Sequence, residues 1–421
     1  MRRIEAQLLI PGRGDPVLDG VVVFDGATIG YAGPAAGAPA TSAAEVTRAR
    51  VVMPGLWDCH VHVTGLRGVG SADFAFTNPA VRGARAVPDL RAALDAGVTS
   101  VRELGGLGTE LAKVVDEGTV EGPAIYAAGA LLGATGGHAD LHDVPAAWGH
   151  ELAVSVGERR QCDGPADCAR AAREQLRRNA KVIKVCASGG VFSEVDHPRH
   201  QQMTKAELAA IVEVAGMADR AVAAHCHGKP GIIAALEAGV HTIEHGTYLD
   251  AECCDAMLET GAILVPTRNV FASFGEAWLP DFARRKGEAI AARHAKALAL
   301  AVERGVPIAA GTDIALSATL ETTLGWGSHG SELALLVAAG MSPAAAIEAA
   351  TATAPRTLGP QAPRSGQLAA GFDADVITLD ADPLADISVL ADPAHVVDVW
   401  RGGTRRKGPG PAAAARQIPV R

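Results

Sequence analysis

Residues 51–62, VVMPGLWDCHVH, decide how the rest of this chain is interpreted. The apolar run 51–53 is typical of a buried strand, and the stretch closes with His60 and His62. Alternate side chains of a strand point to the same face, so these two imidazoles are expected to project together. Two imidazoles at the end of a strand can bind a metal ion. A single such pair describes ordinary core histidines equally well, so the metal prediction depends on residues further along the chain.

Four later apolar runs also carry, at or near their ends, a side chain that can act as a metal ligand or exchange a proton. They contain Lys184 in KVIKVCASGG, His225 in VAAHCHG, His245 in TIEHG and Asp313 in AAGTD. The carboxyl ends of parallel strands meet at one edge of a sheet, so these side chains and the His60–His62 pair could converge on one site. The recurring position at strand ends is stronger evidence than any one of the motifs.

The middle of the chain alternates strands and helices. Several helical runs, from PDLRAALDAG (88–97) to FARRKGEAIAARHAKALALAVERG (282–305), end in Gly, as a helix C-terminus favours. Eight strand–helix units predict a (β/α)₈ TIM barrel over residues 55–358, with its active site at the carboxyl ends of the strands. After the opening strand, the expected strands are 98–104, 124–129, 181–188, 221–225, 240–245, 262–267 and 307–313.

Both ends of the chain have a strand-rich pattern that differs from the strand–helix alternation of the middle. Residues 1–54 contain short strand-like runs such as IEAQLLI and VLDGVVVF, separated by Gly, Pro and Asp. The region 365–407 has the same character. We therefore expect residues 1–54 and 359–421 to form one small β-sandwich domain.

Composition narrows the possible partners. The net charge of −9 is spread along the chain, which argues against a nucleic-acid-binding surface. Seven cysteines at irregular spacing predict reduced thiols and a cytoplasmic protein. The N-terminal run is broken by Glu5 and Pro11, so it is a poor signal peptide, and no apolar segment is long enough to cross a membrane. We expect a homo-oligomer that acts on a small molecule, without a nucleic-acid or membrane partner.

The ordered set of motifs resembles the amidohydrolase superfamily of metal-dependent hydrolases. The resemblance covers nearly the whole chain, because that family also carries a β-sandwich built from both termini. More narrowly, the motifs are similar to a subgroup of imidazolonepropionase-like proteins, Xaa-Pro dipeptidases and ochratoxin-type amidases. They are TGGHAD (135–140), KVCASGGVFS (184–193), AHCHG (224–228), IEHGT (243–247) and GTD (311–313).

The resemblance implies a metal centre and a role for each of its residues. It implies two divalent ions, with zinc as the first choice and the metal identity left open, held by His60, His62, Lys184, His225, His245 and Asp313. In this subgroup the lysine is typically carboxylated and bridges the ions, whereas imidazolonepropionase itself uses one metal and lacks that lysine. A metal-bridging hydroxide would attack the substrate, and Asp313 would pass its proton to the leaving group.

Other strand-end residues are candidates for substrate contacts. The resemblance places His138 on the substrate carbonyl as a second catalytic candidate. His227 stands next to Cys226 where some members have an HAY pattern, and it can be an outer ligand, a substrate contact or neither. The remaining polar candidates, which salt bridges or helix caps would explain equally well, are Arg102, Tyr248, Arg268 and His329. The expected apolar contacts, on loops 65–90, 138–163, 192–203 and 268–290, are Phe192, Phe271, Phe274 and Trp278.

These residues predict a binuclear metal-dependent amidohydrolase that cleaves the amide bond of a dipeptide or an N-acyl amino acid. A lactone, carbamate or cyclic amide remains an alternative substrate for the same site, because fold and metal site do not distinguish them. A non-catalytic scaffold is the alternative of another class. It would be expected to have lost metal ligands, and none of the six is missing.

Overall fold

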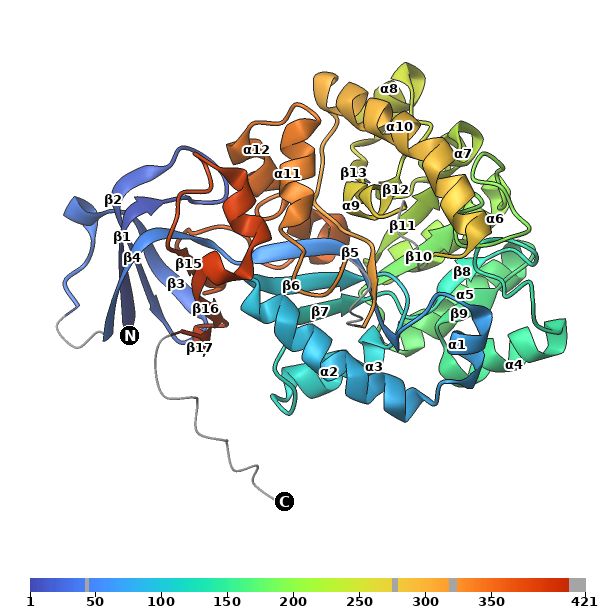
Figure 1. Ribbon diagram of the computed structural model, residues 1–421, viewed down its shortest axis with the longest axis horizontal. Coiled ribbons are helices and arrows are strands. Elements are labelled where there is room, and N and C mark those ends of the chain that lie inside the picture. The colour runs from blue at the N-terminus through green and yellow to red at the C-terminus, as the bar shows by residue number, and fades with distance from the viewer. Residues whose placement is uncertain (42–44, 275–278, 318–323, 409–421) are drawn as a thin grey trace.

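The computed structural model of the protein describes residues 1–41, 45–274, 279–317 and 324–408 (Figure 1). Within this part of the chain, strands from both ends form one seven-stranded sheet, which lies to one side of the helices in Figure 1. Its order is β17-β16-β15-β4-β1-β2-β3. The bounds are β1 Arg2–Leu9, β2 Val17–Asp25, β3 Thr28–Pro34, β4 Glu45–Pro54, β15 Val376–Leu379, β16 Val396–Arg401 and β17 Thr404–Lys407.

The β4–β5 junction connects this sheet to the rest of the molecule. β4 pairs with β1 and β15, and after Gly55 the chain continues as β5, Leu56–Leu66, in a different sheet. A Cβ atom on Gly55 would come within 2.2 Å of Thr99 Oγ1, so only glycine fits at this crossing. Burial changes here too, from a partly exposed start of β4 to an almost completely buried β5, as expected when a strand becomes covered on both faces.

The remaining strands form two parallel sheets. One has the order β14-β5-β6-β7 and the other β13-β12-β11-β10-β8-β9. Their bounds are β6 Val98–Glu103, β7 Ala124–Ala127, β8 Leu131–Gly133, β9 Arg159–Gln161, β10 Val182–Cys186, β11 Ala221–Cys226, β12 Thr242–His245, β13 Ile263–Val265 and β14 Ile314–Leu316.

Helices surround these parallel strands (Figure 1). Their bounds are α1 Ser71–Phe76, α2 Pro79–Asp95, α3 Gly108–Asp116, α4 Ala146–Val156, α5 Pro165–Arg177, α6 Lys205–Gly216, α7 Lys229–Ala238, α8 Ala251–Thr260, α9 Arg268–Ala272, α10 Asp281–Glu303, α11 Ser331–Ala338 and α12 Pro343–Ala349. The alternation of strands and helices predicted from the sequence is therefore present from β5 onward.

Backbone hydrogen bonds also join the two parallel sheets to each other. Lys181 N–H donates to the Ala127 oxygen at 2.7 Å, which links the end of β7 to the start of β10. On the other side, the segment 307–310 lies between β13 and β5. Leu264 N–H donates to the Pro307 oxygen at 2.8 Å and Cys59 N–H to the Ala310 oxygen at 2.9 Å.

The predicted strand 307–313 is less regular than expected. Its strand pairing is limited to a bridge between Leu264 and Ile308, and β14 begins only after Asp313. Asp313 has φ = 64°, which no extended strand tolerates, so the backbone turns at this residue. β8 and β9 were also not expected from the sequence, because each is only three residues long.

Two buried clusters lie on the parallel strands. A large one packs the strands against the helices, and a smaller one lies below the ends of the strands. Val182 and Ala223 of the smaller cluster come two residues before Lys184 and His225, so the side-chain period of a strand places them on the same face, one layer deeper. All seven cysteines are buried and form no disulfide.

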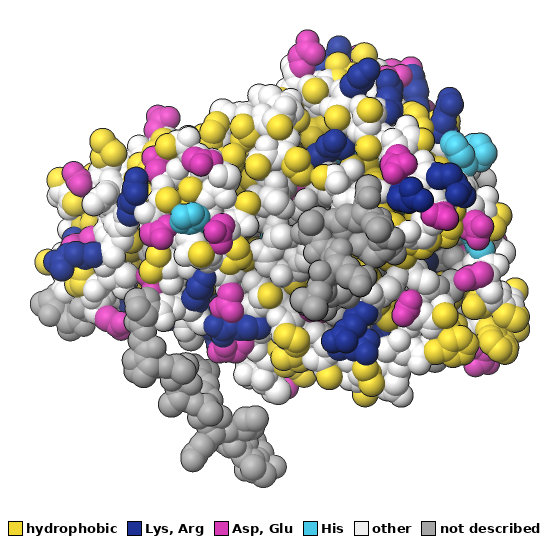
Figure 2. Space-filling view, viewed as in Figure 1, with side chains coloured by type: hydrophobic (Ala, Val, Ile, Leu, Met, Phe, Trp, Pro, Cys, Tyr) yellow, Lys and Arg dark blue, Asp and Glu magenta, His cyan; other side chains and the backbone are white. Residues whose placement is uncertain are grey.

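Charged side chains of both signs are interspersed on the face shown in Figure 2. Within the described residues, no helix combines the length and apolar character needed to cross a membrane.

Candidate active site

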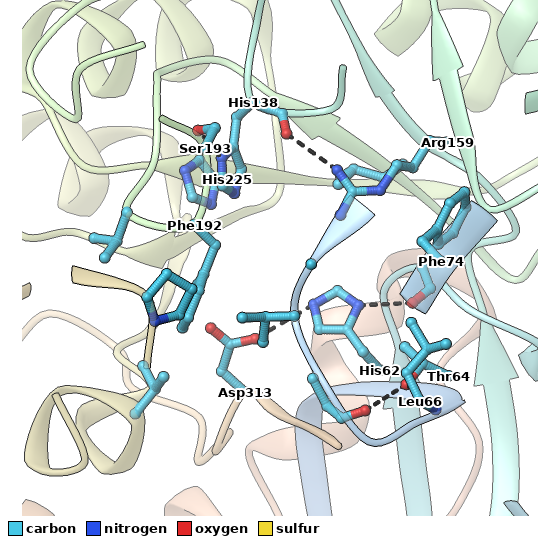
Figure 3. Close-up of a pocket in the computed structure, with 18 of the residues that line it drawn as sticks. His62, Thr64, Leu66, Phe74, His138, Arg159, Phe192, Ser193, His225 and Asp313 are labelled. Atoms are coloured by element: carbon cyan, nitrogen blue, oxygen red, sulfur yellow. Dashed lines mark hydrogen bonds and ion pairs between the residues drawn. The ribbon is translucent and has the colours of Figure 1, made fainter. Parts of the chain in front are cut away.

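A cavity of about 320 Å³ opens at the carboxyl ends of the parallel strands (Figure 3). All four loops predicted to build the substrate site contribute to its walls. The structure also brings the six predicted metal ligands together here. His60 and His62 come from β5, Lys184 from β10, His225 from β11, His245 from β12, and Asp313 from the turn before β14.

His60, His62 and Asp313 form one group of potential ligands. Asp313 Oδ1 lies 3.5 Å from His60 Nε2 and 3.3 Å from His62 Nε2. Lys184 Nζ is 3.3 Å from His60 Nε2, so the lysine borders this group directly. His60, Lys184 and Asp313 are each more than a hundred positions apart in the sequence, and the fold brings them together.

His225, His227 and His245 form a second group, in which one ring nitrogen of each lies within 4.8 Å of those of the other two. β11 and β12 pair in parallel with Cys226 opposite His245, and this register sets the three rings side by side. The sequence left the role of His227 open. The structure places it in the cavity beside the two predicted ligands.

Hydrogen bonds to neighbouring protein groups orient three of the rings. His60 Nδ1 lies 2.8 Å from Glu244 Oε2, His62 Nδ1 lies 2.7 Å from the Gly105 oxygen, and His245 Nδ1 lies 2.7 Å from Thr267 Oγ1. When these partners accept a proton from Nδ1, the Nε2 lone pairs of the rings point inward. Metal-binding histidines are commonly held in this way.

Two of the ligand candidates have left-handed backbone conformations. φ is 70° at His245 and 64° at Asp313. Such angles are unfavourable for residues other than glycine and occur where surrounding contacts hold them. Asp313 N–H donates to the His60 oxygen at 2.7 Å, and Gly246 N–H donates to the Cys226 oxygen at 3.0 Å. These bonds fix the two turns that carry the side chains into the cavity.

Burial governs the electrostatics of the cluster. It lowers the pKa of His60, His225, His227 and His245 well below the ordinary value, which favours neutral imidazoles. Burial also lowers the pKa of the Lys184 ammonium. For Asp313, burial acts to raise the pKa, but nearby His60, His62 and Lys184 outweigh it, and the net pKa lies below the usual value.

A buried network below the cavity supports Asp313. Asp58 accepts hydrogen bonds from the Thr312 hydroxyl at 2.6 Å and from the Thr312 and His60 N–H groups at 3.1 and 3.0 Å. His329 Nδ1 completes the network, 2.7 Å from the same carboxylate. His329 is therefore placed outside the cavity, where it can act on the site only through Asp58.

His138 lies in the cavity wall above the second histidine group (Figure 3). Its ring stacks on that of His225, with centroids 4.4 Å apart, and its Nδ1 lies 2.8 Å from Ser193 Oγ. Ser193 in turn donates to Asp196 Oδ1 at 2.5 Å. Within the described residues, Nε2 of His138 makes no hydrogen bond, so this nitrogen can contact a ligand.

Arg102 and Arg268 require a correction, because neither lines the cavity. Arg102 is completely buried, and its guanidinium donates to both carboxylate oxygens of Glu244 at 2.8 and 2.9 Å and to Thr242 at 3.0 Å. It therefore holds Glu244, the partner of the His60 ring. Arg268 donates to the Ala291 oxygen of α10 at 3.2 Å. The predicted substrate contacts of both arginines are thus replaced by internal ones.

Tyr248 is a third correction. The centre of its ring lies 5.5 Å from the guanidinium carbon of Arg199 and 6.0 Å from that of Arg293, and it does not line the cavity. The predicted apolar contacts Phe192, Phe271 and Phe274 do line the cavity, and Trp278 falls outside the described residues.

Sequence reasoning missed Arg159 and the apolar residues near it. Arg159 lines the cavity and lies with its guanidinium carbon 5.5 Å from the centre of the Phe74 ring. Arg159 is the first residue of the short strand β9. This strand contains no apolar run from which it could have been predicted. A second apolar wall, formed by Leu66, Phe74, Leu141 and Leu316, also went unrecognised.

The residues present fit divalent metal ions. Five imidazoles and one carboxylate lie in the same cavity. The pKa of four of the imidazoles is lowered, which favours their neutral form. Neutral imidazole nitrogens with free lone pairs and one carboxylate therefore lie close together. A cation relieves the repulsion between such donors. Imidazole and carboxylate ligands suit zinc and other divalent transition metals.

Comparisons with known proteins agree with this geometry. Residues 51–406 match the model of the amidohydrolase family. The chain is 42% identical to ochratoxinase of Aspergillus niger over 430 residues, covering 97% of this chain and 87% of that protein. It is 28% identical to imidazolonepropionase of Xanthomonas campestris over 437 residues, covering 94% and 97%.

Solved structures show the same relationship. The crystal structure of A. niger ochratoxinase superimposes with a TM-score of 0.90 at 41% identity, covering 97% of this chain and 96% of that one. A Xaa-Pro dipeptidase with bound methionine gives a TM-score of 0.84 at 29% identity, covering 97% and 100%. These neighbours imply a TIM barrel with a β-rich domain, and they confirm the resemblance drawn from the motifs. The chain therefore belongs to the amidohydrolase family of enzymes, which hydrolyse amide carbon–nitrogen bonds.

Proposed function

We propose that this protein is a binuclear metal-dependent amidohydrolase that cleaves the amide bond of an N-acyl amino acid or a dipeptide. One observation carries the proposal. Two groups of metal-binding side chains share a single cavity, and Lys184 lines it with its Nζ beside the first group.

The proposed ligands are His60, His62 and Asp313 for one ion and His225 and His245 for the other. Lys184, carboxylated on its amine, would bridge them, which replaces an ammonium group among cations with an anionic oxygen ligand. His227 belongs to the second group by position and is proposed as an additional ligand or a substrate contact. Zinc is the proposed metal.

Divalent ions at such a site lower the pKa of water and polarise a carbonyl group. The chain's own residues would complete the chemistry. Asp313, which contacts both His60 and His62, would accept a proton and deliver it to the leaving amine. His138, whose ring faces the cavity, is proposed to contact the substrate beside its carbonyl group.

The architecture that supports this site is proposed to be a closed barrel over residues 55–358. The hydrogen bonds between Lys181 and Ala127, and those of segment 307–310, support closure on both sides. Residues 1–54 with 359–421 are proposed as the second domain, and the seven-stranded sheet drawn from both ends supports that division.

The substrate class is supported by the names of the relatives and by the cavity. Ochratoxinase and the Xaa-Pro dipeptidase are both amide-bond hydrolases, and the latter holds methionine, an amino acid, in its active site. The cavity has apolar walls on two sides, which suits an apolar acyl group joined to an amino acid.

A substrate screen tests the proposal. The zinc-loaded protein should hydrolyse members of a panel of dipeptides and N-acyl amino acids and release the free amino acid, which amino-acid analysis detects. A parallel panel of lactones and carbamates provides the contrast. Activity confined to that second panel would contradict the amide assignment.

A further inference from the structure

One cation in the cavity lacks an anionic partner. Arg159 Nη1 donates to the backbone oxygen of His138 at 3.3 Å. Within the described part of the chain, this guanidinium makes no other hydrogen bond and no ion pair. A guanidinium carries five N–H donors in a planar fork, so most of those of Arg159 are available to a ligand. Figure 3 shows the group beside His138 and Phe74 at the edge of the cavity.

The acidic residues near Arg159 are already engaged. Glu158 forms a buried ion pair with Arg82, with a distance of 2.6 Å between Oε2 and Nη2. Asp140 accepts the N–H groups of Gly136 and Leu141, both at 2.8 Å. Among the described residues that line the cavity, Lys184 is the other cation, and it belongs to the proposed metal site. Arg159 is thus the cation left for an anionic part of the substrate.

We propose that Arg159 binds the free carboxylate of the amino acid that leaves the substrate. This assignment rests on the proposed function. The planar fork of arginine matches a carboxylate through two parallel hydrogen bonds. Phe74, 5.5 Å from the guanidinium carbon, belongs to the apolar wall with Leu66, Leu141 and Leu316. The side chain of the same amino acid would pack there, so a large apolar residue is preferred at this end of the substrate.

The arrangement also gives the substrate a direction. Arg159 and Phe74 lie on the His62 side of the cavity, whereas Phe192 lies on the opposite side of Asp313 (Figure 3). Phe192 and Phe274 contact each other with ring centroids 6.0 Å apart, and both line the cavity. The acyl group would therefore lie against these rings, and the leaving amine would lie toward Arg159.

Paired substrates test the role of Arg159. The kcat/KM of N-benzoyl-L-phenylalanine is measured against that of its C-terminal carboxamide, for the wild type and Arg159→Gln. The variant should lower the ratio of acid to carboxamide by about 100-fold, because a charge-assisted pair is lost for the acid alone. Arg159→Lys should restore part of the ratio. An equal loss on both substrates, or no loss, would overturn the assignment.

Arg160→Gln is the matched control. Arg160 is the neighbouring residue, but it pairs with Asp167 and Glu174, both at 2.9 Å, outside the cavity. Its substitution should leave the ratio unchanged, and a change equal to that of Arg159→Gln would show a general effect on β9.

A binding measurement separates this inference from the proposed function. If the wild type hydrolyses no member of the panel of dipeptides and N-acyl amino acids, the proposed function fails. Calorimetry with L-phenylalanine and the zinc-loaded protein still decides the role of Arg159. At least about tenfold weaker binding to Arg159→Gln than to the wild type is expected. Equal affinity, or no binding to the wild type, rejects the carboxylate contact.

Discussion

At the scale of the residue, Lys184 offers the sharpest test of the metal site. Lys184→Ala should lose bound metal and activity together, because it removes the bridging ligand. Acetate or propionate added to the variant should restore part of both, by placing a carboxylate where the carboxylated amine stood. Metal analysis and kcat are measured on the same samples.

Lys181→Ala is the control for that variant. Lys181 lies three residues earlier, and its ammonium binds the Asn179 side chain at 2.9 Å, away from the cavity. Full metal content and activity in Lys184→Ala would refute the ligand role of Lys184.

Asp313 carries the second prediction at this scale. Asp313→Asn keeps the size of the side chain but removes its ability to accept a proton. It should retain the fold and much of the metal, with kcat lowered about 10³-fold. Asp255→Asn, a surface residue paired with Arg304, is the control. If kcat falls only a few-fold, proton transfer depends on another residue, and His138 is the next to substitute.

The residue scale also shows what sequence reasoning can and cannot find. The positions of six ligand candidates were predictable because each ends an apolar run in a parallel-strand pattern. Arg102 also stands at a strand end, yet its guanidinium binds Glu244 across the molecule, a contact that no local pattern reveals. Arg159 was missed for the opposite reason, because the strand that carries it is only three residues long.

At the scale of the element, Glu332 joins α11 to α9. Its carboxylate accepts the first two N–H groups of α9, those of Arg268 and Asn269, at 2.8 and 2.7 Å. Burial raises the pKa of Glu332 to about 8, despite the opposing effects of these two N–H groups and of the Arg268 charge, and the neighbouring Asp58 raises it further. His329 is the other titratable group beside it.

This shift predicts a pH dependence of stability. Between pH 4.5 and about 8 the folded protein keeps a proton on Glu332 that the unfolded chain releases. The stability contribution is therefore fully present below pH 4.5 and is lost as the pH rises through about 8. The slope from this one proton is at most about 1.4 kcal/mol per pH unit.

Glu332→Gln should flatten that part of the profile. At low pH the variant should differ little from the wild type, because the neutral amide resembles the protonated carboxyl group of Glu332. Thermal unfolding followed from pH 5 to 9 measures both effects, with Glu348→Gln at the surface as the control. An unchanged slope in Glu332→Gln would show that another group causes the pH dependence.

The positions of the helices could be predicted from the sequence, but the irregularity of the last predicted strand could not. The helical patterns of α5 to α8 and α10, with a glycine at the C-terminal end of each except α5, were sufficient to place these helices. The last predicted strand was not regular, because Asp313 must leave the extended conformation to reach the histidines. The position that Asp313 takes in the site outweighs the local preference for a strand. A run of apolar residues in the sequence does not reveal this change of backbone conformation.

At the scale of the whole molecule, the metal ions should contribute to stability as well as to catalysis. Analysis after gentle purification should find close to two divalent ions per chain. A chelator should abolish activity and lower Tm, and added zinc should reverse both changes. Metal at a hundredfold excess over its Kd stabilises a folded protein by about 2.7 kcal/mol. A metal content of one equivalent or less would contradict the binuclear site.

The seven buried thiols can report how readily different parts of the native protein open. An alkylating reagent can reach each of them only when the surrounding structure opens. They are distributed over separate elements, with Cys186 and Cys226 on central strands, Cys168 in α5, and Cys253 and Cys254 in α8. Mass spectrometry of peptides labelled over time would therefore rank the order in which these parts of the native protein open, with no probe added to the chain.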